Sequence, residues 1–436
     1  MRKHIYPFIL IALLLASCTP MENPVVKFYG VSLNNEILAI GYGDSYQLIA
    51  SVLPGRSSDK VTFEWTSNNA AVAEVDDNGL VTAQNHGEAI ITVTASFEGT
   101  SFSSTCAVTV VPVDVYIPDD NFRNYCLENF DTNGDGVLSS TETVSVYDLR
   151  VSNTGIISLE GIQYFKSLNL IYCGSNQLES LDVSQNTNLK DIICSGNQLI
   201  ALDVSQNALL TRLDCSYNQL IDLDVSQNSL LGRLICTYNQ LTTLDVSQNS
   251  HLLELECRYN QLTALDVSQN TLLSELYCDI NQLTALDVSQ NALLKSFYCS
   301  NNQLTSLDVS QNSLLAYLSC SHNQLTALDV SQNPLLKTFY CNNNQLTSLD
   351  VSLNTAIVVL DCSYNQLSAL NLSHNSALEL FYCGDNQLTS LDLSNNPDLV
   401  ILSCMNNPNL LELWLKTGHV LWRLTKDNYT VIKYKD

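Results

Sequence analysis

The most constraining feature of this 436-residue chain is a set of twelve cysteines that recur every 21 residues, from Cys173 to Cys404. The eleven intervals between them are identical in length. A fixed period of about 20–50 residues is typical of solenoids, in which a repeat buries its apolar face only by stacking on its neighbours. The chain therefore predicts a coiled array, and such an array offers partners extended faces rather than a pocket.

Every coil repeats the same columns of residues, numbered here from its cysteine. Apolar residues fall at −5, −2, +5, +8 and +10 and asparagine at +3 and +13, as in Leu252, Leu255, Asn260, Leu262, Leu265, Val267 and Asn270 around Cys257. The alternation of apolar and polar residues at 255–257 and again at 265–268 predicts two short strands per coil, one on each side. The asparagines are predicted to bond backbone groups at the two turns.

This pattern resembles the short, 21-residue bacterial class of leucine-rich repeats over residues 149–408. The resemblance implies stacked parallel strands and a concave strand side on which partners bind. With residues 25–113 and 114–148 added, the predicted fold class is mainly β. It consists of a solenoid of about thirteen coils, preceded by an Ig-like sandwich and a short helical cap.

The cysteine column is interpreted as core. A metal ladder or a redox chain would need thiols that converge, yet an in-line column brings at most two thiolates to any point. Thiols on neighbouring parallel rungs also point the same way, which is poor geometry for a disulfide. Because free cysteine is among the most buried residue types, we predict that the column fills space as a small apolar side chain.

Tyrosines occupy two columns that are predicted to face outward on the strand side, where the outward positions are −3, −1, +1 and +2. The residues assigned to a ligand-binding face are Tyr277, Tyr298, Tyr340 and Tyr382 at −1 and Tyr217, Tyr238, Tyr259 and Tyr364 at +2. Tyrosine suits recognition because it combines a rigid ring with a hydrogen-bonding tip. Two alternatives stay open: rings that stack on sugars, and cross-strand contacts that only stabilise the sheet by about 0.2–1 kcal/mol each.

Aspartate fills the +9 column in ten coils, from Asp182 to Asp392, and Asn371 replaces it in one. Carboxylates one rung apart repel by about 1 kcal/mol in water. We predict that each carboxylate accepts hydrogen bonds from neighbouring backbone or hydroxyl groups, such as the threonine often found at +6. Calcium bridging along the column is the alternative, although the chain lacks the glycine-rich Asp repeats of calcium β-rolls.

The N-terminus carries a predicted targeting signal. Residues 1–17 combine a basic start, a short apolar run and small residues, which is typical of a secretory signal peptide. The Leu-Ala-Ser that precedes Cys18 resembles a bacterial lipobox, which implies that Cys18 becomes the lipidated first residue, followed by a tether over 18–24. Thr19, rather than an aspartate, follows Cys18, and in lipoproteins of Gram-negative bacteria this implies that the protein is located at the outer membrane. An ordinary signal peptide or a short anchor is the alternative.

Residues 25–113 lack the 21-residue rhythm and alternate β-rich runs with turns such as the Asp-Asp-Asn-Gly at 76–79. The residues around Trp65 and the run 87–95 resemble the bacterial Ig-like group 2 family. The resemblance implies a β-sandwich that acts as a spacer or an adhesion module. Trp65 and Cys106 are predicted to be core residues.

Residues 114–148 contain a motif with explicit metal chemistry. Positions 1, 3, 5, 7, 9 and 12 of an EF-hand calcium loop are filled, in order, by Asp131, Asn133, Asp135, Val137, Ser139 and Glu142. Calcium takes about six to eight oxygen ligands, which these side chains, the Val137 carbonyl and one water would supply. Helices predicted on both sides would cap the array, with one structural calcium ion; an ion-free acidic turn is the alternative.

The C-terminal residues 409–436 lose the repeat and are predicted to form a second cap. Trp414, Trp422, Tyr429 and Tyr434 are expected to pack on the last coil rather than to bind a ligand.

Charge and composition narrow the function. A net charge of −25 argues against nucleic acid or an anionic membrane as partner. The six histidines show no catalytic spacing, so we predict no enzyme. The sequence therefore predicts a monomeric, lipid-anchored surface protein that binds an extracellular protein or glycan through its tyrosine-bearing face. The alternatives are a structural spacer without a ligand and an accessory protein that presents polysaccharide.

Overall fold

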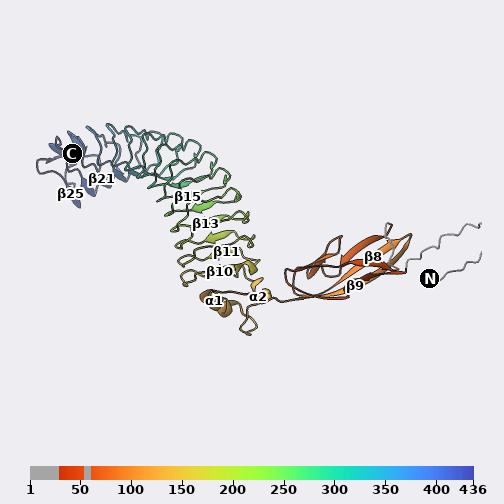
Figure 1. Ribbon diagram of the computed structural model, residues 1–436. Helices are drawn as coiled ribbons and strands as arrows, with labels where there is room; N and C mark the ends of the chain where they lie inside the picture. The colour runs from red at the N-terminus through yellow and green to blue at the C-terminus, as the bar shows by residue number, and fades with distance from the viewer. Residues whose placement is uncertain (1–28, 54–59) are drawn as a thin grey trace, which may run out of the picture. The chain divides into compact units, whose positions relative to one another are not determined.

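The computed structural model describes residues 29–53 and 60–436 (Figure 1). Its internal contacts divide the chain into two compact units between Val113 and Asp114. Cys18 and the predicted signal peptide lie outside the described residues. Among the described residues, no helix is long and apolar enough to cross a membrane.

The first unit consists of β-strands in three sheets. The sheets have the orders β1-β4, β3-β7-β6 and β2-β9-β8-β5. Their strands are β1 Gly30–Leu33, β2 Ile37–Gly41, β3 Ser45–Gln47, β4 Ala50–Leu53, β5 Thr62–Ser67, β6 Ala73–Val75, β7 Leu80–Ala83, β8 Gly87–Phe97 and β9 Thr100–Val111.

The core of this unit lies between the sheets. Leu48, Ile91 and Cys106 are fully buried, and Trp65 packs against them while remaining partly exposed. Gly79 has a φ of +84°, and a Cβ there would lie 2.6 Å from the Trp65 ring, so the turn needs glycine for both conformation and space.

The second unit begins with two helices that close one end of the repeat array. The helices are α1 Asp120–Phe130 and the single turn α2 Ser140–Thr143. Phe122 and Cys126 of α1 are fully buried in the same apolar cluster as the coils, and the Phe122 ring lies 6.1 Å from that of Phe165. This part therefore caps the apolar end of the solenoid, as a coil stack requires.

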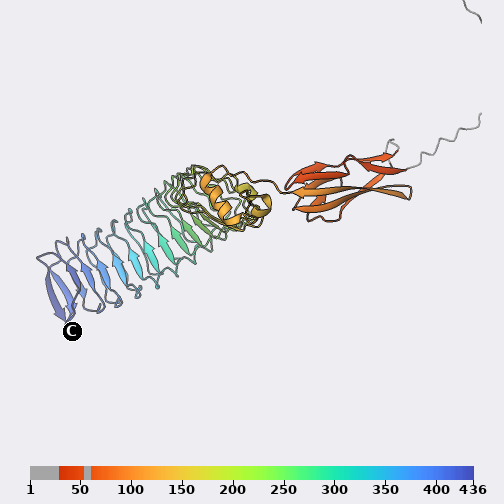
Figure 2. The same cartoon turned by 90° about the horizontal axis from the view of Figure 1, so that it is seen from below.

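The array itself forms a 14-stranded parallel sheet. Each strand pairs with the next at a shift of 21 residues, except in the first and last pairs, where the shift is 22: Asp148 lies opposite Leu170 and Ile401 opposite Arg423. The strands follow the inner, concave side of the curved array (Figures 1 and 2). They are β10 Asp148–Arg150, β11 Leu170–Tyr172, β12 Asp191–Ile193, β13 Arg212–Asp214, β14 Arg233–Ile235, β15 Glu254–Glu256, β16 Glu275–Tyr277, β17 Ser296–Tyr298, β18 Tyr317–Ser319, β19 Thr338–Tyr340, β20 Val359–Asp361, β21 Leu380–Tyr382, β23 Ile401–Ser403 and β25 Arg423–Thr425.

The prediction of a second strand in every coil is wrong. Residues 265–267 form no strand and lead into a turn at 268–269, and among the described residues the far side forms strands only near the C-terminal end, beginning at β22 Leu391–Leu393. The apolar residues at +8 and +10 are buried as predicted, for example Leu265 and Val267. Their alternation reflects burial in a tight turn rather than strand pairing.

Two asparagine columns hold the turns together. Asn260 at +3 donates from Nδ2 to the carbonyls of Cys236 at 3.0 Å and Cys257 at 3.1 Å, and its Oδ1 accepts from the Leu241 N–H at 3.0 Å. Asn270 at +13 donates to Val246 at 3.0 Å and Asn249 at 2.9 Å. The predicted backbone role of both columns is confirmed.

The C-terminal residues extend the array instead of only covering it. Strands β22, β24 Glu412–Lys416 and β26 Val431–Lys435 form a second parallel sheet, while β25 joins the main one. The predicted packing of the aromatic residues is wrong for Trp422, which is 78 % exposed, and Tyr434 is also exposed.

Candidate functional site: the strand face

The outward side chains of the strands lie at −3 and −1. In β15, Glu254 and Glu256 are half-buried on either side of the fully buried Leu255, and most of the other coils repeat this arrangement. The +1 column, which we also predicted to face outward, is mostly buried: Ser216, Thr237 and Ser300 are examples. We therefore define the strand face by the −3, −1 and +2 columns, together with the half-buried charged +1 residues Arg258 and Asp279.

Residues at +2 share an unusual backbone conformation. Each has a φ between about 51° and 67°, in the left-handed region, whatever its side chain. Several coils place residues there that accept this conformation well, such as Gly196, Asn301, Asn343 and Asp385. Four coils instead carry tyrosine, and one carries the β-branched Ile280.

Three of these +2 tyrosines form a stack across neighbouring coils. The ring centroids of Tyr217 and Tyr238 are 4.5 Å apart, and those of Tyr238 and Tyr259 are 3.8 Å apart. All three are exposed, as is Tyr364, which lies apart from them. The stacked rings present their edges and hydroxyl tips to solvent because most of their faces cover one another.

The −1 tyrosines are less accessible than the +2 tyrosines. Tyr277, Tyr298, Tyr340 and Tyr382 are all half-buried. Tyr277 and Tyr298 stack with centroids 5.0 Å apart, and the Tyr277 hydroxyl donates to Glu275 at 2.7 Å. The structure thus places all eight predicted tyrosines in the two columns expected and brings five of them into stacks.

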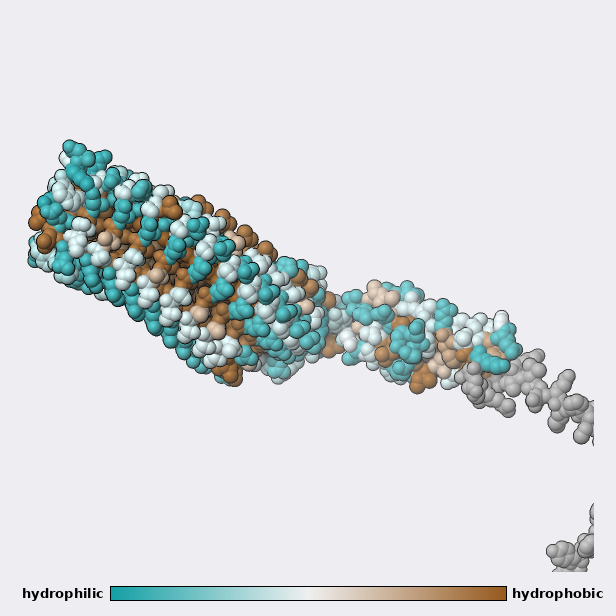
Figure 3. Space-filling view, turned by 90° about the horizontal axis from the view of Figure 1, so that it is seen from above, coloured by the Kyte–Doolittle hydropathy of each residue, from teal (hydrophilic) through white to brown (hydrophobic). Residues whose placement is uncertain are grey.

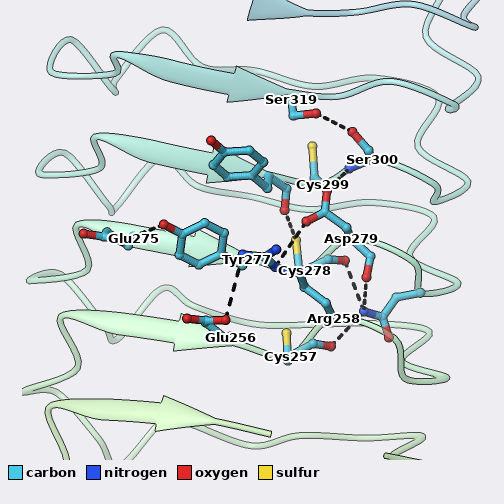
Figure 4. Close-up of polar contacts among 12 residues, drawn as sticks. Glu256, Cys257, Arg258, Glu275, Tyr277, Cys278, Asp279, Cys299, Ser300 and Ser319 are labelled. Atoms are coloured by element: carbon cyan, nitrogen blue, oxygen red, sulfur yellow. Dashed lines mark hydrogen bonds and ion pairs between the residues drawn. The ribbon is translucent and has the colours of Figure 1, made fainter. Parts of the chain in front are cut away.

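Arg258 lies at the centre of a polar cluster beside these rings (Figure 4). Its guanidinium carbon is 4.2 Å from the centroid of the Tyr277 ring. Its nitrogens lie 3.9 Å from a carboxylate oxygen of Glu256 and 3.6 Å from one of Asp279. The arginine therefore combines ion pairs with a cation–π contact, an arrangement suited to its planar charge.

Two carboxyl groups in this cluster titrate near neutral pH. Burial raises the pKa of Glu254 to about 7, assisted by the hydrogen bond that the protonated Glu254 donates to Glu256 and opposed by Arg233. Burial raises the pKa of Asp279 to about 6, although the Ser300 N–H and Arg258 oppose the increase. The strand face therefore carries carboxyl groups whose charge depends on pH near neutrality.

The predicted calcium loop has oxygen donors, but its side chains bond within the loop. The two carboxylate oxygens of Asp131 accept from Gly134 at 2.7 Å and Gly136 at 2.9 Å. Burial raises the pKa of Glu142, but hydrogen bonds from Ser139, Thr132 and Asn133 outweigh this effect and lower it to about 2. The donors are hard oxygens of the kind that calcium prefers, and the lowered pKa favours the charged form of Glu142.

The three acidic ligands predicted for the loop do not converge. Among the described residues, no group of three His, Cys, Asp or Glu side chains is close enough to hold a metal ion. Asn133 donates to Asp135 at 2.9 Å, and the Asp135 and Asn133 oxygens accept from Val137 and Asp135 N–H groups. The chemistry of the donors thus fits calcium, whereas their arrangement is that of a closed turn.

The cysteine column is core. Cys173, Cys257 and the other ten members are free and fully buried. Burial raises the pKa of their thiols, to about 12 for Cys236 and Cys320. A thiol that stays protonated is neither a nucleophile nor a metal ligand, in agreement with a space-filling role.

The aspartates at +9 are held by the backbone. Asp266 accepts from the Ser268 N–H at 2.9 Å, and the equivalent bond to the serine at +11 recurs along the column. Hydrogen bonds from Ser268 lower the pKa of Asp266. The predicted local acceptor role is correct, but the partner is the serine two residues on rather than the threonine at +6.

One exposed column was not singled out from the sequence. Leucines at −6 stand exposed on the turns between the far side and the strand, at Leu209, Leu230, Leu272, Leu293, Leu314 and Leu335. Figure 3 shows hydrophobic surface that runs lengthwise along the array. In the sequence these leucines adjoin the buried leucine at −5, so the two could be told apart only by the direction of each side chain.

The stacked coils, the buried leucine and cysteine columns and the asparagine ladder define a leucine-rich-repeat protein. The first unit matches the model of the bacterial Ig-like domain (group 2) over residues 27–108. The predicted combination of these two folds is thus confirmed.

Comparisons with known proteins support both parts. The functional domain of InlJ from Listeria monocytogenes, which includes a cysteine ladder, is 33 % identical with a TM-score of 0.54, over 69 % of this chain and 80 % of that one. An internalin, InlF, from Listeria monocytogenes shares the fold at 20 % identity and a TM-score of 0.57, over 75 % and 94 % of the two chains. An uncharacterised protein of Clostridium acetobutylicum is 38 % identical over 100 residues, which are 23 % of this chain and 24 % of that protein's length.

These similarities agree with the predicted class of function. Leucine-rich-repeat and Ig-like domains are in general non-enzymatic binding or adhesion folds, and their combination fits a bacterial surface or adhesion protein.

Proposed function

We propose that this protein binds an extracellular protein through the strand face of its repeat array. The observation that carries the proposal is tyrosine at +2, where the backbone is left-handed. A non-glycine residue in this conformation costs about 1–2 kcal/mol, and asparagine or glycine reduces that cost in other coils. Tyr217, Tyr238, Tyr259 and Tyr364 are therefore poor choices for the backbone and good choices for an outward contact.

The stacking of these rings favours a protein over a glycan. A sugar binds an aromatic residue through the ring face, yet Tyr238 has a neighbouring ring on both sides. Edges, hydroxyl tips and the charged groups around Arg258 remain available, and they match the mixed polar and aromatic character of protein interfaces. A structural spacer would have no reason to place strained, exposed tyrosines on one column.

The experiment is a binding screen with a matched variant. The full chain and the combined variant Tyr217→Asn, Tyr238→Asn and Tyr259→Asn are tested against panels of extracellular proteins and glycans, and both are melted. We expect protein binding to be lost while the melting temperature changes little, since asparagine suits the left-handed backbone. Tyr147→Asn, at an exposed tyrosine in the cap, is the control. A lower melting temperature of the triple variant with unchanged binding would favour the structural role.

We further propose that residues 131–142 bind one calcium ion through Asp131, Asn133, Asp135, the Val137 carbonyl, Ser139 and Glu142. The support is the filled set of loop positions and the hard oxygens described above. The site lies directly after α1, whose Phe122 and Cys126 are buried in the array core. Calcium would supply rigidity to this cap rather than chemistry.

The anchoring of the protein is proposed from the sequence. The residues before Cys18 resemble a lipobox, and more than one acyl chain is needed for stable anchoring. We propose that Cys18 is lipidated and that the protein is held at the outer membrane, facing outward. Cys18→Ala should move the protein from the membrane fraction to the soluble fraction, and protease treatment of intact cells should report which way the array faces.

A further inference from the structure

We infer that the open face of the Tyr217 ring, above Gly196, is a seat for an arginine side chain of a protein partner. This inference rests on the proposed function, because it names one contact on the strand face. It concerns the end of the tyrosine stack rather than its middle.

The geometry leaves one ring face of the stack uncovered. Tyr238 covers one face of Tyr217, at a centroid distance of 4.5 Å and an interplanar angle of 18°. On the other side the +2 column holds Gly196, which has no side chain, followed by Ser175. Tyr217 is accordingly 58 % exposed, whereas Tyr238 and Tyr259 are 37 % and 38 % exposed.

The vacant rung has room for a planar group. Neighbouring coils are about 4.8 Å apart, so Tyr217 and Ser175 are separated by about 10 Å along the column. A guanidinium plane stacked on the ring at about 4 Å would lie over Gly196. At the other end of the stack the next position holds Ile280, which has a side chain, and Tyr259 is less exposed than Tyr217.

The chemistry of the array selects arginine as the occupant. Two arginines among the described residues already lie over tyrosine rings, with Arg150 at 4.6 Å from the Tyr172 centroid and Arg258 at 4.2 Å from that of Tyr277. The net charge of −25 attracts a cation. Asp214 lies on the same coil, and its Oδ1 accepts from Ser216 at 2.6 Å. Its Oδ2 has no hydrogen-bond partner among the described residues and is available to a guanidinium fork.

Gly196→Tyr tests the seat by filling it. The glycine has a φ of +67°, and its added Cβ would lie no closer than 3.4 Å to Ser175. Tyrosine already occupies this column at φ values of 51–55°, so the substitution extends the stack and covers the open face. Gly418→Tyr is the matched control, because it also adds a tyrosine at an exposed glycine with a left-handed φ of +80°, where nothing lies within 4 Å of the added Cβ, and this position is not on the strand face.

The probe is a displayed library of random twelve-residue peptides, selected on the immobilised full chain at physiological salt. Enriched peptides are synthesised and titrated by fluorescence anisotropy. We expect arginine to be enriched and the peptides to bind at least tenfold more weakly to Gly196→Tyr and Tyr217→Ser, with binding to Gly418→Tyr unchanged. Replacing the peptide arginine with lysine should weaken binding, and with norleucine abolish it. Melting curves verify that each variant is folded.

Three other outcomes would contradict the inference. Peptides that bind Gly196→Tyr as well as the unmodified chain, but are lost with the triple asparagine variant, overturn the seat and leave the strand-face proposal intact. If peptides without arginine, or glycans, bind the unmodified chain but bind Gly196→Tyr more weakly, the seat binds a chemical group other than arginine. If no peptide prefers the unmodified chain to the triple variant, both proposals fail.

Discussion

At the scale of single residues, the +2 column shows how a fold and a function make opposite demands. The turn after each strand requires a left-handed residue, and asparagine, aspartate or glycine meets that requirement in several coils. Tyrosine does not, and the three stacked tyrosines recover part of the cost through ring contacts worth about 0.5–1.5 kcal/mol per pair. Tyr364 has no such ring partner among the described residues.

We therefore predict that Tyr364→Asn stabilises the protein by about 1 kcal/mol, because it relieves left-handed strain without breaking a stack. Tyr238→Asn should be neutral or destabilising, since it removes two ring contacts. Equilibrium unfolding in urea measures both. A loss of stability for Tyr364→Asn would show that its ring makes a stabilising contact of its own.

Glu254 gives a prediction for pH. Burial raises its pKa to about 7, so between its unfolded value and pH 7 the folded state binds the proton more tightly than the unfolded state. Its contribution to stability therefore falls as pH rises through about 7. We expect Glu254→Gln to be more stable than the unmodified chain at pH 8 and equal to it at pH 5. Melting curves across this range, with exposed Glu160→Gln as control, measure the difference; parallel pH profiles would contradict it.

At the scale of elements, the two asparagine ladders differ in how fully they are bonded. Asn281 at +3 donates to Cys257 at 3.0 Å and Cys278 at 3.1 Å and accepts from Leu262 at 3.0 Å. Asn291 at +13 makes the two donor bonds, but its buried Oδ1 has no partner in the part of the chain that the structure describes.

Asn281→Ala should consequently cost more than Asn291→Ala. At about 1 kcal/mol for each net hydrogen bond, with an added cost for buried groups left unpaired, we expect about 3–4 kcal/mol against about 2 kcal/mol. Urea unfolding of the two variants gives the order directly. The reverse order would mean that the +13 asparagines stabilise the coil turns more than the +3 asparagines do.

The cap is the element to which calcium would matter. If residues 131–142 bind the ion, removing it with a chelator should lower the melting temperature by several degrees, because binding to the folded state alone adds to stability. Restored calcium should reverse the change, and Asp131→Asn with Asp135→Asn should make the protein insensitive to chelator. Identical melting curves of the unmodified chain with and without chelator would show that calcium does not stabilise the cap.

At the scale of the whole molecule, the array is a linear stack of nearly identical coils. Each coil contacts only its neighbours, so stability is close to a sum over coils and interfaces. The unbroken 21-residue spacing keeps every column in register from β11 to β23.

Deleting one whole coil should therefore be tolerated, whereas a deletion one residue shorter should not. Removing residues 321–341 joins Cys320 to Asn342 and leaves all columns aligned. Removing 321–340 shifts every later side chain by one position and moves the apolar columns to the surface. We expect a melting temperature close to that of the full chain for the first variant and a poorly folded C-terminal half for the second, by circular dichroism and limited proteolysis.

The sequence alone determined the coil, its core and the outward −3, −1 and +2 columns, because the repeat shows each environment twelve times and a buried column hardly varies. It also placed the Ig-like domain, whose strand and turn pattern is local. The sequence pattern alone identified Leu255, Cys257 and Asn260 as interior residues.

Tertiary structure decided the rest, since it depends on distances between coils rather than along the chain. It replaced the second predicted strand by turns, buried the +1 column, and exposed Trp422. Only the stacked coils show that Tyr217, Tyr238 and Tyr259 cover one another and that Gly196 leaves one ring face open. The repeat specifies which residues face outward, but contacts between rungs determine which of them a partner can reach.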